Sequence, residues 1–466
     1  MTLIKSISGI RGTIGGKVGD NLTPVDAVKF ASAYGTFLKA GSGKLEDGRK
    51  LKVVIGRDAR ISGPMIHNLV QNTLLGLGID VIDLGLSTTP TVEVAVPMEN
   101  ADGGIILTAS HNPKQWNALK LLNAKGEFLS GAEGAKILEI ADTEAFDFVD
   151  VDTLGEVTVN DSYMDIHIDE VLELPLVDAD LVKTKKYKVV VDGVNSTGGI
   201  IIPNLLEQMG VEVVKLYCEP NGHFPHNPEP LKEHLGDICK LVIDEKADFG
   251  IVVDPDVDRL AFISNDGEMF GEEYTLVAVA DYVLSKTPGN TVSNMSSSRA
   301  LRDITEKHNG SYQASAVGEV NVVELMKKTN AIIGGEGNGG IIYPELHYGR
   351  DSLVGVALFL TYLAGQDKTV AELRESYPQY YMSKNKIELT PQIDVDAILE
   401  SLTATYKNEQ ISTIDGVKID FATEWVHLRK SNTEPIIRIY TEAPTQQEAD
   451  VLAERFVNEL KVIAGI

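Results

Sequence analysis

Short apolar runs that end in polar loops recur along the chain. Four such runs are rich in β-branched or aliphatic residues, and each leads into a loop that carries Asp, Ser or Arg. Apolar runs of this kind, bounded by turn residues, are typical of buried β-strands. The runs with their loops span Leu51–Arg60, Gly103–Pro113, Tyr187–Thr197 and Phe249–Leu260. Polar loops at strand ends are where α/β folds bind their ligands.

Helical patterns occupy much of the chain between these strands. Thr23 and Pro24 form a suitable N-cap and first-turn pair for the first helix. Strand and helix alternate, which predicts mixed α/β domains, and the likeness of the strand–loop segments suggests repeated α/β units. The final segment, Lys386–Ile466, reads strand, helix, strand, strand, helix and indicates a smaller α+β domain. The predicted helices before it are Leu22–Lys39, Gly63–Leu77, Ile200–Met209, Leu235–Lys246 and Glu319–Lys328.

Length and charge narrow the class of protein. At about 100–200 residues per domain, the length predicts three or four domains. The chain has 68 acidic and 42 basic residues, and its net charge of −26 argues against nucleic acid and anionic membranes as partners. Cys218 and Cys239 form neither a disulfide framework nor a metal motif. The first residues do not resemble a signal peptide, and no apolar stretch is long enough to span a membrane, so we expect a cytoplasmic enzyme.

A serine lies in the loop after the second of these apolar runs, in the sequence Thr108-Ala-Ser-His-Asn-Pro113. Ser110 could act as a nucleophile if its surroundings activate the hydroxyl. A simple Ser/Asn/Pro turn is the alternative. No G-x-S-x-G surrounds Ser110, so the serine-hydrolase elbow is not supported.

Three aspartates alternate in the loop after the fourth run, at Asp254, Asp256 and Asp258. Carboxylates spaced in this way can converge on one divalent cation, and ligation by oxygen alone suits Mg²⁺. An EF-hand is excluded because Arg259 and Asn265 occupy the positions that need Gly and Glu. An aspartyl phosphatase of the D-x-D-x-[TV] type would need Thr or Val in place of the third aspartate. A solvated acidic turn remains the alternative.

A glycine-rich loop, Gly334–Gly340, carries Glu336 and Asn338. Glycines let the backbone approach a ligand closely, and the two polar side chains could bind sugar hydroxyls. The loop lacks the G-x-x-x-x-G-K-[ST] pattern of a P-loop, and a flexible turn is an equal alternative.

A basic loop follows a predicted strand near the C-terminus, in the sequence Arg429-Lys-Ser-Asn-Thr-Glu-Pro435, and Arg438 follows on the next strand. Guanidinium groups, hydroxyls, an amide and turn N–H groups suit a phosphate dianion. A capped loop without a ligand is the alternative.

These four loops together resemble those of the α-D-phosphohexomutases, a family that includes phosphoglucomutase, phosphomannomutase and phosphoglucosamine mutase. The start SGIRGT, with Arg11, is similar to the family's N-terminal arginine motif. TASHNP is similar to its phosphoserine loop, DPDVDR to its metal loop, GEGNGG to its sugar-binding loop and RKSNTEPIIR to its phosphate-binding loop. The motifs stand in the family's order over the whole chain, and five in order are far more specific than any one.

The resemblance implies a heart-shaped enzyme of four domains, three similar mixed α/β domains and a smaller C-terminal α+β domain, around one cleft. Domain I would carry the phosphoserine loop, domain II the metal loop, domain III the sugar-binding loop and domain IV the phosphate-binding loop. We expect these domains at residues 1–152, 153–262, 263–375 and 376–466.

The resemblance also implies a role for each motif residue. Ser110 would carry the phosphoryl group and, with the three aspartates, bind one Mg²⁺. Arg11, His111 and Lys120 would lie near the transferring phosphoryl group, with Lys120 as candidate general acid or base. Arg259 and the two polar residues of the glycine-rich loop would contact the substrate. The phosphate that is not transferred would be bound by Arg429, Ser431, Asn432, Thr433 and Arg438.

One departure from the family pattern bears on the substrate. Many members have Ser-Gly-His where this chain has Asn338-Gly339-Gly340, so a histidine that is sometimes assigned a proton-transfer role is absent. The Asn-Gly-Gly form and the SGIRGT start resemble the archaeal-type phosphoglucosamine mutases. The implied reaction interconverts hexose 6-phosphate and hexose 1-phosphate through a bound 1,6-bisphosphate, which also primes the serine. Glucosamine 6-phosphate is the expected substrate.

Three alternatives remain open for the function. They are a phosphoglucomutase/phosphomannomutase of dual specificity, a metal-dependent phosphosugar phosphatase, and a non-catalytic phosphosugar-binding protein. The sequence predicts no oligomeric state.

Overall fold

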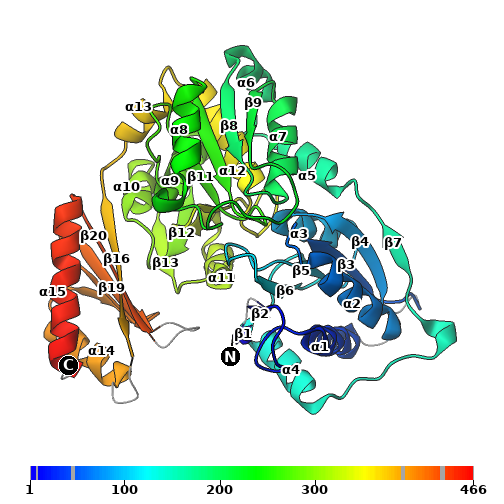
Figure 1. Cartoon of the computed structure of the whole chain (residues 1–466). Helices are drawn as coiled ribbons and strands as arrows, with labels where there is room; N and C mark the ends of the chain where they lie inside the picture. Colours follow the sequence, from blue (N-terminus) through cyan, green and yellow to red (C-terminus); the bar gives the residue numbers. More distant parts are fainter. Residues whose placement is uncertain (1, 7–8, 43–47, 390–393, 431–435, 465–466) are drawn as a thin grey trace. The chain divides into compact units, whose positions relative to one another are not determined.

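The computed structural model describes residues 2–6, 9–42, 48–389, 394–430 and 436–464 (Figure 1). The chain divides into two compact units. Unit 1 comprises Met1–Thr275 and Gly339–Ala371, and unit 2 comprises Leu276–Asn338 and Glu372–Ile466. Among the described residues, no helix is long and apolar enough to cross a membrane.

Unit 1 begins with a seven-stranded sheet in the order β1-β2-β6-β5-β3-β4-β7. Strands β5, β3, β4 and β7 run parallel to one another, whereas β1, β2, β6 and β5 pair antiparallel. The strands are β1 (Ile4–Ser6), β2 (Gly9–Thr13), β3 (Lys52–Arg57), β4 (Asp80–Leu86), β5 (Gly103–Leu107), β6 (Trp116–Leu122) and β7 (Val157–Val159). Their helices are α1 (Pro24–Ser42), α2 (Gly63–Gly76), α3 (Thr89–Met98) and α4 (Gly131–Thr143), with a short 3₁₀ turn, η1 (Val151–Thr153).

Alternation along the central strands fills a core on each face of this sheet. Val53 and Ile55 of β3 belong to one apolar cluster, which includes residues of α1, α2 and α4. Val54, between them, belongs to a second cluster with residues of α3 and Ile166. Both faces are therefore buried, as the continuous apolar runs of the sequence predict.

A second sheet of unit 1 has the order β11-β10-β8-β9, with β10 parallel to β8 and antiparallel to β11. Phe359 of helix α12 stacks on Phe262 of β11, with ring centroids 3.9 Å apart, and so packs this helix onto the sheet. The strands are β8 (Lys188–Asp192), β9 (Glu212–Leu216), β10 (Phe249–Val253) and β11 (Leu260–Ile263), and β15 (Gly340–Ile342) precedes α12. The helices are α5 (Tyr163–Leu172), α6 (Ala179–Lys185), α7 (Gly198–Gln208), α8 (Gly236–Asp244) and α12 (Ser352–Ala364), with η2 (Lys232–His234).

Unit 2 contains a parallel arrangement in which β12 lies between β13 and β14. Its strands are β12 (Asn290–Asn294), β13 (Tyr312–Ser315) and β14 (Ala331–Glu336), and its helices are α10 (Ala300–Lys307) and α11 (Glu319–Thr329). Helices α9 (Glu272–Lys286) and α13 (Val370–Glu375) contain two of the three points where the chain passes from one unit to the other.

The end of unit 2 is a five-stranded antiparallel sheet in the order β16-β20-β19-β18-β17. The elements are β16 (Tyr381–Glu388), α14 (Val395–Thr405), β17 (Gln410–Ser412), β18 (Val417–Asp420), β19 (Trp425–Lys430), β20 (Ile436–Ala443) and α15 (Gln446–Ala464). The sequence predicts the α+β character of this segment, but the structure has two more strands, the short β17 and β18. The Lys418 ammonium and Glu442 carboxylate bond to the backbone of Met295 and Arg299, which joins the sheet to the rest of unit 2.

The predicted strands and helices before this sheet are all present, with ends shifted by a few residues. The four predicted domain ranges stay a prediction, and Val157–Val159, which they assign to the second domain, pairs with β4 of the first sheet.

Candidate active site

The serine loop follows β5 and holds Ser110 in a left-handed backbone conformation, with φ at 47°. A non-glycine residue in this region is uncommon and costs about 1–2 kcal/mol, so the surrounding contacts must impose it. The Ser110 N–H donates to Thr108 Oγ1 at 3.0 Å, and the Thr108 hydroxyl donates to Asp58 Oδ2 at 2.7 Å. Only 6% of the Ser110 surface is exposed.

Arg60 supports this loop through hydrogen bonds to its backbone. Its guanidinium is fully buried and pairs with Asp58 Oδ2 at 2.9 Å. It also donates to four backbone carbonyls of the serine loop and the strand after it, at distances of 2.5 to 3.1 Å. These acceptors are the carbonyl oxygens of Ser110, Asn112, Pro113 and Trp116. One arginine therefore fixes the path of the whole loop.

The aspartate loop follows β10 and contacts the serine loop directly. Ser110 donates a hydrogen bond from Oγ to Asp254 Oδ2 at 2.7 Å, across a sequence separation of 144 residues. The other oxygen of Asp254 accepts the backbone N–H groups of Asp258 and Arg259, both at 3.1 Å. Val257, between the last two aspartates, has φ at 64°, which turns the loop back on itself. Asp254, Asp256 and Asp258 are all fully buried.

Cationic side chains balance the buried aspartates. The Lys120 ammonium lies 2.6 Å from Asp256 Oδ2 and 3.2 Å from Asp258 Oδ2. Arg350 donates to Asp258 Oδ2 at 2.7 Å. The hydroxyl of Thr89, at the start of α3, donates to Asp256 Oδ2 at 2.5 Å. Two of these groups, Arg350 and Thr89, are site residues that sequence reasoning missed.

The charges perturb the pKa values of the groups that face one another. Burial raises the pKa of Asp254 well above its ordinary value, and the charges of Asp258 and Asp256 raise it further. Burial would also raise the pKa of Asp258, but Arg350, Lys120 and Arg259 hold it well below its usual range. Burial would lower the pKa of Lys120, yet its two aspartates raise it above the ordinary value. Lys120 is therefore a charged ammonium while it contacts both carboxylates.

The aspartate loop suits a divalent cation. One carboxylate oxygen from each aspartate can be chosen so that all three lie within 4.8 Å of one another. Asp256 Oδ1 and Asp258 Oδ1 are buried and accept no hydrogen bond from any residue that the structure describes. Buried carboxylate oxygens without donors are costly unless a cation binds them. An all-oxygen donor set is the one that Mg²⁺ prefers.

Three further predicted residues surround the serine. His111 Nδ1 lies 3.4 Å from Ser110 Oγ, and Arg11 Nη1 lies 3.4 Å from Asn112 Oδ1 in the same loop. Arg259 pairs with Glu229 at 3.4 Å and approaches Asp258 at 4.0 Å. Burial and the charge of Arg259 lower the pKa of His111 well below its usual value, so its imidazole is neutral at pH 7. Unit 1 thus brings together all the phosphoryl-site residues that the sequence predicts.

The glycine-rich loop begins in unit 2, where Glu336 ends β14, and its last two residues, Gly339 and Gly340, belong to unit 1. The buried Glu336 carboxylate accepts hydrogen bonds from the Asn294 amide at 2.8 Å and the Gly318 N–H at 3.2 Å. The Asn338 amide lies 3.5 Å from the other carboxylate oxygen. These contacts hold Glu336 in one orientation at the end of its strand.

The basic residues of the C-terminal sheet face each other across two strands. Arg429 on β19 and Arg438 on β20 are direct partners in the antiparallel ladder. Like charges at such positions repel, so the pair suits an anionic ligand. Ser431, Asn432 and Thr433, which the sequence assigns to the same phosphate site, lie outside the described residues.

The supporting residues Arg60 and Arg350 contact partners that are far away in the sequence. Asp58 and Arg60 follow directly after β3, and their local sequence indicates only one of the repeated strand–loop segments. Arg350 is 92 residues from its partner Asp258, and no local pattern connects them. The position of Arg60 just after a buried strand is the local feature that could have marked it as a site residue.

A buried serine beside a carboxylate cluster, with cations around both, is the kind of site that a metal-dependent phosphotransfer enzyme needs. Family models for the four domains of phosphoglucomutase/phosphomannomutase match this chain in order: the α/β/α domains I, II and III and the C-terminal domain. They cover residues 3–148, 165–267, 271–381 and 385–459. The chain belongs to the phosphoglucomutase/phosphomannomutase family and is a phosphohexomutase, an isomerase.

Relatives cover nearly the whole chain. A phosphoglucomutase/phosphomannomutase of Thermococcus kodakarensis is 36% identical over 94% of this chain and 95% of its own length. A protein of Methanopyrus kandleri named probable phosphoglucosamine mutase is 32% identical over 97% and 96%. A solved structure of a family protein from Burkholderia thailandensis has the same fold, with a TM-score of 0.84 at 24% identity, over 99% of this chain and 98% of that one. The predicted family and the four-domain α/β architecture are confirmed.

Proposed function

We propose that this phosphohexomutase moves a phosphoryl group between O6 and O1 of glucosamine phosphate through Ser110. The main support for this proposal is the contact of 2.7 Å between Ser110 Oγ and Asp254 Oδ2, because it places the serine hydroxyl against the carboxylate cluster. In the proposed cycle, phospho-Ser110 gives its phosphoryl group to the free hydroxyl of the monophosphate. The P–O bond to serine breaks as the bond to the sugar oxygen forms. The sugar hydroxyl gives up a proton and the departing serine oxygen takes one, with Lys120 as the group proposed to pass it between them. The resulting 1,6-bisphosphate turns over, and Ser110 takes the other phosphoryl group.

Asp254, Asp256 and Asp258 would hold Mg²⁺ together with an oxygen of phospho-Ser110. The bound ion would supply charge neutralisation at the transferring phosphoryl group. Arg11 and His111 would orient the phosphoryl group, since both lie at the serine loop.

Lys120 is the proposed general acid or base. In this structure its ammonium is bound to two aspartates, so it can serve first as the acid. It could accept a proton only when those carboxylates are neutralised by another cation. The absence of a histidine from the Asn338-Gly339-Gly340 segment supports the assignment to Lys120.

The substrate contacts are assigned by charge and motif. Glu336 and Asn338 would bind the sugar, and a carboxylate suits an ammonium group as well as hydroxyls. Arg259 would contact the substrate near the aspartates. Arg429 and Arg438, with Ser431, Asn432 and Thr433, would bind the phosphate that is not transferred. Catalytic hexose 1,6-bisphosphate would prime the serine, and the cytoplasm remains the predicted location.

A second candidate is a phosphoglucomutase/phosphomannomutase of dual specificity. The relative from Thermococcus kodakarensis is named phosphoglucomutase/phosphomannomutase and shares 36% identity with the chain, against 32% for the Methanopyrus kandleri protein named probable phosphoglucosamine mutase. Phosphosugar hydrolysis is less favoured, because a hydrolase needs no second phosphate site such as the arginine pair.

The test is a coupled assay with Mg²⁺ and catalytic hexose 1,6-bisphosphate on the 6-phosphates of glucosamine, glucose and mannose. We expect glucosamine 6-phosphate to lead in kcat/KM by about tenfold or more, which corresponds to about 1.4 kcal/mol in transition-state binding. Ser110→Ala should abolish turnover, whereas the exposed Ser162→Ala should leave it unchanged. A lead for glucose or mannose selects the second candidate, and an active Ser110→Ala variant would refute the mechanism.

A further inference from the structure

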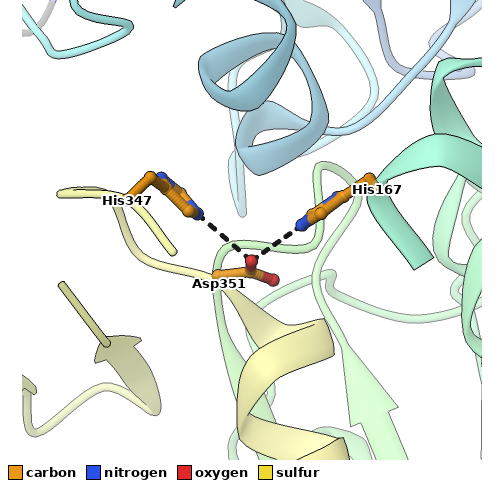
Figure 2. Close-up of side chains that lie close together, drawn as sticks. All are labelled: His167, His347 and Asp351. Atoms are coloured by element: carbon orange, nitrogen blue, oxygen red, sulfur yellow. Dashed lines mark hydrogen bonds and ion pairs between the residues drawn. The ribbon is translucent and has the colours of Figure 1, made fainter. Parts of the chain in front are cut away.

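A second buried polar cluster in unit 1 contains two histidines and an aspartate (Figure 2). His167 comes from α5, His347 from the loop after β15, and Asp351 is the N-cap residue of α12. Asp351 Oδ2 lies 2.9 Å from His167 Nε2 and 3.1 Å from His347 Nε2. Figure 2 shows both imidazole rings pointing at this one carboxylate from opposite sides. None of the three residues has a role in the proposed reaction.

The outer nitrogen of each ring faces a side chain of α3. His167 Nδ1 lies 3.0 Å from Thr91 Oγ1, and His347 Nδ1 lies 3.4 Å from Glu93 Oε2. Gly349 lets the loop pass close to this glutamate, since a Cβ there would collide with Glu93 Oε2. The Thr91 hydroxyl can either donate to His167 Nδ1 or accept from it, and the Glu93 carboxylate can only accept, so both rings can carry their proton on Nδ1. In that tautomer, which metal binding would select, the lone pair of Nε2 is free to bind an ion beside Asp351.

The surroundings of His347 favour a cation. His347 stands between the carboxylates of Glu93 and Asp351, and a neutral imidazole has one N–H for the two of them. The other nitrogen would face a carboxylate with its lone pair, which is unfavourable in a buried site. A cation between Nε2 and Asp351 removes the repulsion. It is either a second proton on the ring or a metal ion that binds both groups.

We propose that His167, His347 and Asp351 form a second metal site, which takes one divalent transition-metal ion such as Zn²⁺. Two imidazole nitrogens and one carboxylate oxygen are a donor set that zinc prefers and Mg²⁺ does not. The three donor atoms all lie within 4.8 Å of one another. Ligands at about 2.0 Å in a tetrahedral zinc site are about 3.3 Å apart, close to the two measured separations. A water molecule would complete the four ligands.

The site is suited to a structural role. It joins α3, α5 and the start of α12, three segments that are far apart in the sequence. Arg350, next to Asp351, donates to Asp258 of the aspartate loop, and Thr89 of α3 donates to Asp256. A metal bound by the second site would therefore fix two segments that support the aspartate loop, whatever sugar the protein acts on.

The test measures zinc retained by the full-length protein. Chelator-treated protein is loaded with Zn²⁺ in millimolar Mg²⁺, which occupies the aspartate loop, and its metal content is measured after gel filtration. We expect one zinc per chain in the wild type and none in His347→Gln. The matched control is His226→Gln, since His226 Nε2 pairs with Asp192 at 3.0 Å without a second histidine; it should keep one zinc. No retained zinc in the wild type, or equal retention in His347→Gln, would overturn the proposal.

A second measurement does not depend on the folding of a variant. X-ray absorption at the zinc edge of the loaded wild type should show imidazole scattering from two nitrogen ligands at about 2.0–2.1 Å. A shell of oxygen ligands alone would place the zinc among the aspartates and overturn the proposal. Neither readout uses catalytic activity, so the proposed reaction and this metal site can fail separately.

Discussion

Replacement of Arg60 by lysine tests whether one buried guanidinium holds the nucleophilic serine in place. Lysine keeps the positive charge and most of the length but removes the planar fork. The Arg60 guanidinium serves Asp58 and four carbonyl oxygens. An ammonium has three donors, so at least two of these five acceptors lose their hydrogen bond from residue 60.

The expected loss of stability follows from those two acceptors. An unpaired buried acceptor costs about 1–3 kcal/mol, and water can reach the exposed Pro113 end of the loop. We therefore expect Arg60→Lys to lower the free energy of unfolding by about 2–4 kcal/mol. The protein has two tryptophans, Trp116 in unit 1 and Trp425 in unit 2. Urea titration in a Trp425→Phe background would report the unit that contains Arg60.

The matched control is Arg49→Lys. Arg49 also makes a two-pronged pair with an aspartate, Asp102, at 2.7 and 2.8 Å, but its side chain is 38% exposed. An exposed pair contributes about 0–1 kcal/mol, so this variant should remain near wild type. We also expect kcat of Arg60→Lys to fall by about 100-fold, since displacement of Ser110 by about 1 Å has that effect. Equal unfolding energies for the two variants, or unchanged kcat in Arg60→Lys, would refute the reasoning.

Three further predictions concern charge. Lys120→Met should lower kcat by at least about 100-fold, the range of general acid–base catalysis, and a small primary amine should restore part of the rate; a variant with wild-type kcat would remove Lys120 from the mechanism. Arg350→Met should also lower kcat, but amines should not rescue it, because the guanidinium pairs with Asp258 rather than moving a proton; an unchanged steady-state rate would contradict this. Burial lowers the pKa of His427 to about 4, below the value of about 6.5 in the unfolded chain. The unfolded chain therefore binds a proton at higher pH than the folded one, and the free energy of unfolding falls as the pH drops from about 6.5 towards 4. The expected loss at pH 5 is about 2 kcal/mol, measured by urea titration in a Trp116→Phe background; His427→Gln should remove this pH dependence, and an equal slope in that variant would exclude His427 as its cause.

Local sequence patterns predict much of the fold, because its central strands are buried on both faces. Val53–Ile55 and Ile251–Val253 are apolar throughout, and the polar residues that follow them in the sequence mark where each strand ends. The three aspartates at alternating positions of one loop also predict a metal site from local sequence alone. The short strands β17 and β18 were missed in part because three or four residues are too few for a periodic pattern.

The supporting residues of the site could not be predicted, because their partners lie far away in the chain. Arg60 binds carbonyl oxygens, which every residue has, so no partner side chain could mark its role. The family resemblance predicted Lys120, but its salt bridges to Asp256 and Asp258 come from the folding of β6 against the aspartate loop. The two histidines of the second site are separated by 180 positions and follow no known spacing.

The adjacent residues Arg350 and Asp351 connect the aspartate loop to the histidine cluster. The Arg350 guanidinium neutralises Asp258, while the Asp351 carboxylate receives both histidines and also caps α12 by accepting the N–H groups of Leu353 and Val354. Burial would raise the pKa of Asp351, but the two histidines hold it well below its ordinary value, so the cap remains charged. A charged cap stabilises the start of a helix through the helix dipole. The position of Arg350 at the aspartate loop is therefore fixed by a helix terminus and a histidine cluster that take no part in phosphoryl transfer.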